Sequence, residues 1–159
     1  MTKTEWVGAG VIRIDAKDKV RGVLKYMSDL SFPNMIHGAV LRSKHPHALI
    51  KKIDTKRAKE LDGVVTVLTH EDVPGLNGFG IAIPDQPVLC SDKVRYMGDA
   101  IALVGAESKE IAEQALDLIG VEYQPLPVVC DPEQAMLSAS PLVHETGNIH
   151  NHVKIERGD

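Results

Sequence analysis

The sequence predicts an α+β domain in which short, mostly antiparallel strands combine with two or three helices. Segments that read as strands follow one another in runs, and this argues against a doubly wound sheet, where strands and helices alternate regularly. One segment, residues 109–119, repeats apolar side chains at a helical period. The 159 residues are 43% hydrophobic and 25% charged, which is ordinary for a globular domain.

The chain begins with a mixed arm, residues 1–16. Apolar and charged side chains alternate over residues 11–15, a pattern that is compatible with a short edge strand. Residues 20–29 alternate more loosely and are predicted to form a strand. Turn-forming residues follow at 29–34.

The segment between residues 35 and 74 is dominated by strand patterns that short helical turns separate. A run of β-branched residues at 64–69 predicts a buried strand. Gly63 and Pro74 mark ends of the neighbouring helical turns. The predicted elements are a strand at 35–42, its continuation or partner at 48–54, a helical turn at 55–60, the buried strand at 64–69 and a second helical turn at 70–74.

The strongest pattern predicts a strand at 92–106, a helix at 107–120 and a strand at 121–124. Ser108 is placed to cap the start of this helix, and Gly120 is placed to end it. The apolar stripe of the helix consists of Ile111, Ala112, Ala115, Leu116 and Ile119.

Beyond this unit, the series Asp-Pro-Glu-Gln at 131–134 predicts another helix start. Periodicity is lost after residue 137. We therefore predict one main domain at 17–137 and a linker at 138–159.

Composition excludes several classes of function. The net charge of −4 leaves no basic patch for nucleic acid, so we expect no nucleic-acid partner. No apolar run approaches the roughly 20 residues of a membrane span, so no membrane partner is expected. The first residues contain no apolar core of a signal peptide, and a cytoplasmic location is expected.

No self-contained active site is predicted from the residue patterns. Two His-x-His pairs, at 45–47 and 150–152, lack acidic or cysteine neighbours at a ligand spacing, so we interpret them as exposed turn and linker histidines. Cys90 and Cys130 cannot hold an iron–sulfur cluster by themselves and are interpreted as ordinary packed or edge residues. The glycines at 75–80 precede no helix, so they are not a dinucleotide-binding loop.

One long irregular stretch, residues 75–85, is rich in glycine and also apolar. A loop of this length and composition is unusual in a compact domain. It is predicted either to pack on something outside the domain or to line a site.

A collinear series of short motifs extends over nearly the whole chain. Each motif is weak alone, but their order is specific. They lie at 13–22, 39–43, 53–54, 61–64, 67–69, 72–75, 85–89, 92–98, 119–123, 126–127, 141–145 and 147–148. The series resembles the N-terminal α/β-hammerhead domain of the large, molybdenum-cofactor subunit of the xanthine dehydrogenase/aldehyde oxidase family. One local departure, in a predicted turn, falls at 43–50.

The resemblance implies a molybdenum hydroxylase of the xanthine dehydrogenase type, an oxidoreductase that hydroxylates purines or related heterocycles and aldehydes. It implies molybdenum–molybdopterin in the full subunit, and iron–sulfur clusters and FAD on partner subunits. In the family, the pterin-binding loops and the catalytic glutamate lie downstream of the hammerhead. We therefore expect no catalytic, cofactor-binding or metal-binding residue in this chain, and the isolated chain is expected to be inactive.

By position in the family, the residues after the loop glycine line the mouth of the substrate channel. The resemblance thus implies a hydrophobic gate formed by Gly80, Ile81, Ala82 and Ile83. The alternative is a loop that is clamped on a neighbouring domain.

The expected partners are the C-terminal molybdenum-cofactor domains of the same subunit and the iron–sulfur and flavin subunits. Apolar surface left bare in the isolated chain would also allow a homodimer. The alternative from another class is a stand-alone scaffold or binding module with the same fold. A third interpretation is a carrier domain of the lipoyl or biotinyl type, but the chain shows no lysine at a clear hairpin tip, which such a domain needs.

Overall fold

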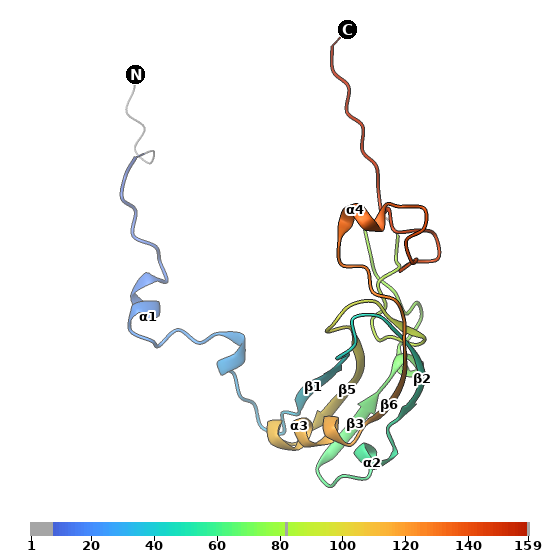
Figure 1. Ribbon diagram of the computed structural model, residues 1–159. Helices are drawn as coiled ribbons and strands as arrows, with labels where there is room; N and C mark the ends of the chain where they lie inside the picture. The colour runs from blue at the N-terminus through green and yellow to red at the C-terminus, as the bar shows by residue number, and fades with distance from the viewer. Residues whose placement is uncertain (1–7, 82, 159) are drawn as a thin grey trace. The chain divides into compact units, whose positions relative to one another are not determined.

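The computed structural model describes residues 8–81 and 83–158. The chain forms two compact units, Met1–Met35 and Ile36–Asp159, and each is described by itself (Figure 1). Among the described residues, no helix is both long enough and apolar enough to cross a membrane.

The first unit contains a short helix, α1 (Ala16–Val20), and a 3₁₀ turn at Met27–Asp29. The predictions of an edge strand at 11–15 and a strand at 20–29 are therefore wrong. A strand needs a partner for its backbone groups, whereas local bonds satisfy this segment. For example, the amide of Tyr26 donates to Asp29 Oδ2 over 3.0 Å.

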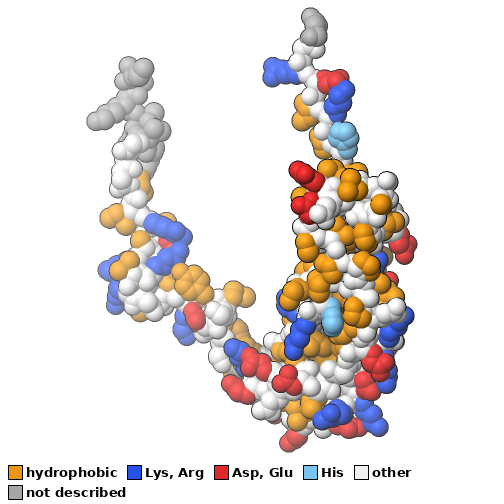
Figure 2. Space-filling model, viewed as in Figure 1, with side chains coloured by type: hydrophobic (Ala, Val, Ile, Leu, Met, Phe, Trp, Pro, Cys, Tyr) orange, Lys and Arg blue, Asp and Glu red, His pale blue; other side chains and the backbone are white. Residues whose placement is uncertain are grey.

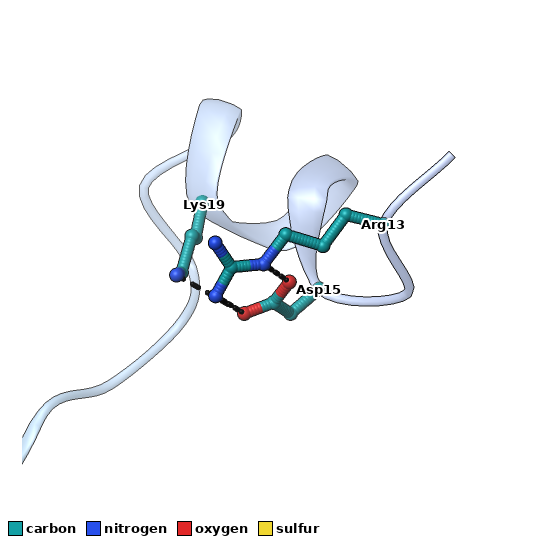
Figure 3. A network of polar contacts seen from close by, with 3 residues as sticks. All are labelled: Arg13, Asp15 and Lys19. Carbon is teal, nitrogen blue, oxygen red and sulfur yellow. Dashed lines mark hydrogen bonds and ion pairs between the residues drawn. The ribbon is translucent and has the colours of Figure 1, made fainter. Parts of the chain in front are cut away.

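A small polar network surrounds α1 (Figure 3). The Arg13 guanidinium binds the Asp15 carboxylate through Nε and Nη2, and Lys19 Nζ lies 3.1 Å from the same carboxylate. Arg13, and then Lys19, hold the pKa of the exposed Asp15 carboxyl below its usual value. The network joins residues on both sides of the helix start, and this explains why charged residues at 13–19 form a helical turn.

Two three-stranded sheets form the second unit, with strand orders β1-β5-β3 and β4-β2-β6. Every pairing in them is antiparallel, which confirms the predicted α+β class. No two neighbouring strands are consecutive in the sequence. The strands are β1 (His37–Arg42), β2 (Ala48–Asp54), β3 (Val64–Leu68), β4 (Lys93–Val94), β5 (Ala100–Ala106) and β6 (Gly120–Pro125).

Three strand predictions need correction. β1 and β2 neither continue nor pair with each other, because the turn at 43–47 carries the chain from one sheet to the other. The predicted strand at 92–106 is divided into β4 and β5 by a turn in which Gly98 has a φ of +105°. β3 is an edge strand and not a buried one, and Val65 on it is 57% exposed.

Besides α1, the helices are α2 (Lys56–Lys59), α3 (Lys109–Asp117) and α4 (Pro132–Ala135), and a 3₁₀ turn lies at His70–Asp72. The caps of α3 and α4 form as predicted: Ser108 Oγ accepts from the Ile111 amide at 3.2 Å, and Asp131 Oδ1 accepts from the Gln134 amide at 2.8 Å.

The end of α3 differs from the prediction. Leu118 caps it, and Gly120 is already the first residue of β6. Leu118 also packs against the core beside the predicted stripe.

The core lies on both faces of β5, the central strand of its sheet. Small and β-branched side chains on one face, Ala102, Val104 and Ala106, meet the apolar stripe of α3. Ile101, on the other face, packs with residues of β2 and β4. The residues that contact both clusters and join them into one core are Leu41, Ile53 and Val121.

Candidate functional site

The predicted loop at 75–85 folds back on itself. Phe79 and Gln86 exchange two backbone hydrogen bonds, of 2.8 and 3.2 Å. Gly78 and Gly80 allow the two arms to approach closely. A Cβ on Gly80 would collide with the carbonyl oxygen of Ile83, and one on Gly78 would lie 2.5 Å from that of Pro84.

Asn77 closes the base of this loop. Its Nδ2 donates to the Leu89 carbonyl at 2.7 Å, and its Oδ1 accepts from the amides of Val88 and Leu89, each at 3.1 Å. Leu89 is buried in the domain. One side chain therefore anchors the loop to the packed part of the domain.

The predicted gate residues differ in their surroundings. Ile81 is fully exposed at the loop tip, and Ile83 is half exposed. Ala82 lies outside the described residues. The loop thus directs apolar side chains outward, as either predicted role requires, and the gate itself stays a prediction.

A cleft of about 340 Å³ lies beside the loop. A second hollow, of about 180 Å³, has Ile83 in its wall and shares Asp85, His144 and His150 with the cleft. The cleft is lined by Asp85, Gln86, Pro87, Arg95, Tyr96, Asp99, His144 and His150. It therefore joins the predicted loop to the β4–β5 turn and to the segment after α4.

The segment after α4 is tied to the domain by hydrogen bonds. Asn148 Oδ1 accepts from the Val143 amide at 2.9 Å, and its Nδ2 donates to the carbonyls of Ala135 and Pro141. Lys93 Nζ donates to the Val143 carbonyl at 2.9 Å. These bonds hold His144 at the cleft, although the sequence predicts only a linker there.

The cleft contains both signs of charge. Asp99 is only 4% exposed, and its Oδ2 accepts from the amides of Arg95 and Tyr96 at 2.6 and 3.3 Å. His144 Nδ1 lies 3.6 Å from Asp85 Oδ2. Burial is the main cause that lowers the pKa of His144, the charges of Arg95 and Lys93 lower it further, and Asp85 opposes them. Burial and the neighbouring cations thus favour the neutral form of His144.

The predicted interpretation of the first histidine pair is wrong for one member. His47 is 4% exposed, and its Nδ1 lies 2.6 Å from the Pro127 carbonyl oxygen. The ring of His45 packs against that of Tyr123 at an interplanar angle of 45°, with 4.5 Å between the ring centroids. Both histidines therefore have packing roles where β2 and β6 meet.

No group of three or more metal-ligating side chains occurs in the described part of the chain. Cys90 is buried, and burial, with the Asp99 carboxylate next in effect, raises the pKa of its thiol to about 12. Cys130 is exposed. As predicted, Cys90 is an ordinary packed residue.

Sequence reasoning singled out the loop but missed Arg95, Asp99, His144 and His150. These residues come from segments that are far apart in the chain, and no residue spacing links them. The only local signal was the Tyr-Met-Gly-Asp turn at 96–99, which resembles an ordinary bend.

Comparison with known proteins places this arrangement in a family. Residues 21–127 match the domain described as "Aldehyde oxidase and xanthine dehydrogenase, a/b hammerhead domain". The chain is 56% identical over 148 residues to a probable xanthine dehydrogenase component of Bacillus subtilis, covering 93% of this chain and 20% of that protein. It is 42% identical over 153 residues to the "Nicotinate dehydrogenase large molybdopterin subunit" of Eubacterium barkeri, covering 96% of this chain and 36% of that protein.

A solved structure gives the same result. The aldehyde oxidoreductase of Desulfovibrio desulfuricans superposes with a TM-score of 0.82 at 33% identity, over 89% of this chain and 17% of that chain. The chain thus spans about a tenth to about a third of the length of curated relatives that it matches. Its family and fold predictions are confirmed: the chain belongs to the aldehyde oxidase and xanthine dehydrogenase family and contains its α/β hammerhead domain.

Proposed function

We propose that this chain is the N-terminal part of the large subunit of a molybdenum hydroxylase of the xanthine dehydrogenase type. The proposed enzyme oxidises purines or related heterocycles and aldehydes in the cytoplasm, with iron–sulfur and flavin subunits as partners. One observation carries the proposal: nearly the whole chain aligns with only a fraction of large molybdenum-enzyme subunits. Membership of the family supports the reaction class. The purine substrate is a more specific proposal within that class.

In this proposal the chain itself binds no cofactor. The described residues offer no cluster of metal ligands, and the Cys90 thiol is buried and protonated. These residues therefore do not fit a molybdenum site. The role left to the hammerhead is structural: its packed sheets hold the loop at 75–85 and the neighbouring cleft against the rest of the subunit.

The loop contributes to the mouth of the substrate channel. Its exposed apolar tip would select flat, poorly hydrated substrates through shape and desolvation. In the full enzyme, we expect Ile81→Trp to raise KM for a bulky substrate more than for a small one, with kcat less affected. Val65→Trp, at an exposed position on β3, is the matched control. The same change in KM for bulky and small substrates, or no change for either, would contradict the gate.

The proposed function is tested by producing the full-length subunit with its partner subunits and measuring molybdenum content and purine oxidation. We expect stoichiometric molybdenum and turnover of a purine such as hypoxanthine. If the subunit contained molybdenum but oxidised nicotinate or an aldehyde and no purine, the proposed hydroxylase would stand and the proposed substrate would be wrong. A subunit without molybdenum would favour the scaffold alternative.

A further inference from the structure

The cleft contains a guanidinium with a buried nitrogen that has no hydrogen-bond acceptor among the described residues. Arg95 Nε is buried and has no hydrogen-bond partner among the described residues. Within residues 8–81 and 83–158, Arg95 also takes part in no ion pair. A buried donor without an acceptor is costly, and arginine cannot relieve that cost by losing its proton. Such a group points to a missing partner.

Among the described residues, neither of the two carboxylates that line the cleft pairs with Arg95. Asp99 accepts hydrogen bonds from the two backbone amides of the β4–β5 turn. Asp85 Oδ2 lies 3.6 Å from His144 Nδ1 and makes no ion pair with Arg95 among the described residues. The nearby Lys93 is occupied by the Val143 carbonyl. Arg95 is therefore the cation of the cleft that is left for an external acceptor.

Large apolar side chains close to the lining residues of the cleft are exposed to solvent. Figure 2 shows hydrophobic side chains gathered on the face of the second unit between its strands and the C-terminal segment. The exposed ones close to the cleft are Tyr96 in its lining, Val88 and Met97 beside lining residues in sequence, Ile83 in the neighbouring hollow, and Phe79, which pairs with Gln86. A small free anion would leave these side chains in water.

We propose that the cleft is a docking site within the subunit, in which Arg95 receives one carboxylate of an Asp or Glu from the remaining part of the same polypeptide. A carboxylate fits the guanidinium through two parallel hydrogen bonds. A group with more negative charge than one carboxylate would be repelled more strongly by Asp85 and Asp99, which already line the cleft. The occupant is a protein surface because the apolar side chains around the cleft need apolar cover as well. This inference rests on the proposed function.

The first test compares Arg95→Leu in the isolated chain and in the full-length subunit. In the isolated chain Arg95 has no partner to lose, so amide hydrogen exchange at 93–99 should stay unchanged or slow down. In the full subunit the substitution leaves the partner carboxylate without its cation, so amide exchange at 93–99 should rise about tenfold or more. Arg57→Leu, on the exposed side of α2, is the control and should have no effect in either context. An equal response of Arg95→Leu in both contexts would overturn the inference.

The second test identifies the partner. In the full-length Arg95→Lys variant, a carbodiimide should couple the new amine to an Asp or Glu beyond residue 159, which peptide mass spectrometry locates. Coupling to Asp85 or Asp99 alone would contradict the proposed partner. Molybdenum is measured on the same preparation. Coupling in a preparation without molybdenum would retain the docking site and reject the proposed function. If the preparation contained molybdenum but Arg95→Leu changed hydrogen exchange equally in the isolated chain and in the full subunit, the proposed function would stand and the docking site would be rejected.

Discussion

The anchoring of the 75–85 loop by a single side chain leads to a sharp prediction for Asn77→Ala. The substitution removes three hydrogen bonds to Val88 and Leu89. Two of the three bonds involve Leu89, which is 2% exposed, so water replaces these two partners poorly. At about 0.5–1.5 kcal/mol for each bond, the loss of stability should be about 2–4 kcal/mol.

Urea unfolding followed by far-ultraviolet circular dichroism measures this loss. With a slope of about 2 kcal/mol/M, the midpoint should fall by about 1–2 M. Hydrogen exchange of the Val88 and Leu89 amides should accelerate in the same variant because both amides lose their acceptor. Asn151→Ala is the matched control, since Asn151 is exposed and lies in a segment without regular structure. The reasoning would be refuted if the midpoints of Asn77→Ala and of the control differed by less than roughly a tenth of the predicted shift.

Three further predictions concern the core and the cleft. Because burial raises the pKa of Cys90 to about 12, Ellman's reagent at pH 8 should modify only Cys130 in the folded chain and both thiols in urea; two equivalents in the folded chain would contradict the burial. Asp85→Asn should lower the pKa of His144 further, because it removes the charge that raises it, and an upward shift in an NMR titration would reverse the assigned sign. Ala115→Leu should destabilise the domain by about 1–3 kcal/mol, since Ala115 is fully buried between α3 and β5; a neutral thermal melt would show that space is available there.

The correct predictions were those that depend on local patterns. The apolar stripe of α3 and its Ser108 cap involve residues within a few positions of one another, so the chain segment itself specifies them. The same is true of the Asp131 cap on α4. The glycines of the loop at 75–85 were visible as an irregular segment, and close backbone approach at Gly78 and Gly80 is the physical reason for them.

Most of the incorrect predictions concern strands and their pairing. Residues 20–29 contain strand-like alternation, but in the described structure no partner strand pairs with them. The segment at 92–106 has continuous β character, yet it supplies strands to two different sheets. Alternation describes which residues suit a pleated surface and says nothing about which distant strand will provide the hydrogen bonds.

By itself, the sequence determined the α+β class, the main helix and its cap, the position of the glycine-rich loop, and the resemblance to a family. All of these are recorded in residue types and spacings along the chain. Only the tertiary structure decided that β5 is the centre of one sheet and that β2 is the centre of the other. It also decided that Arg95, Asp99 and His144 share one cleft. The physical reason is that sheet pairing and cleft formation depend on free energies summed over contacts between distant segments, which no local pattern contains.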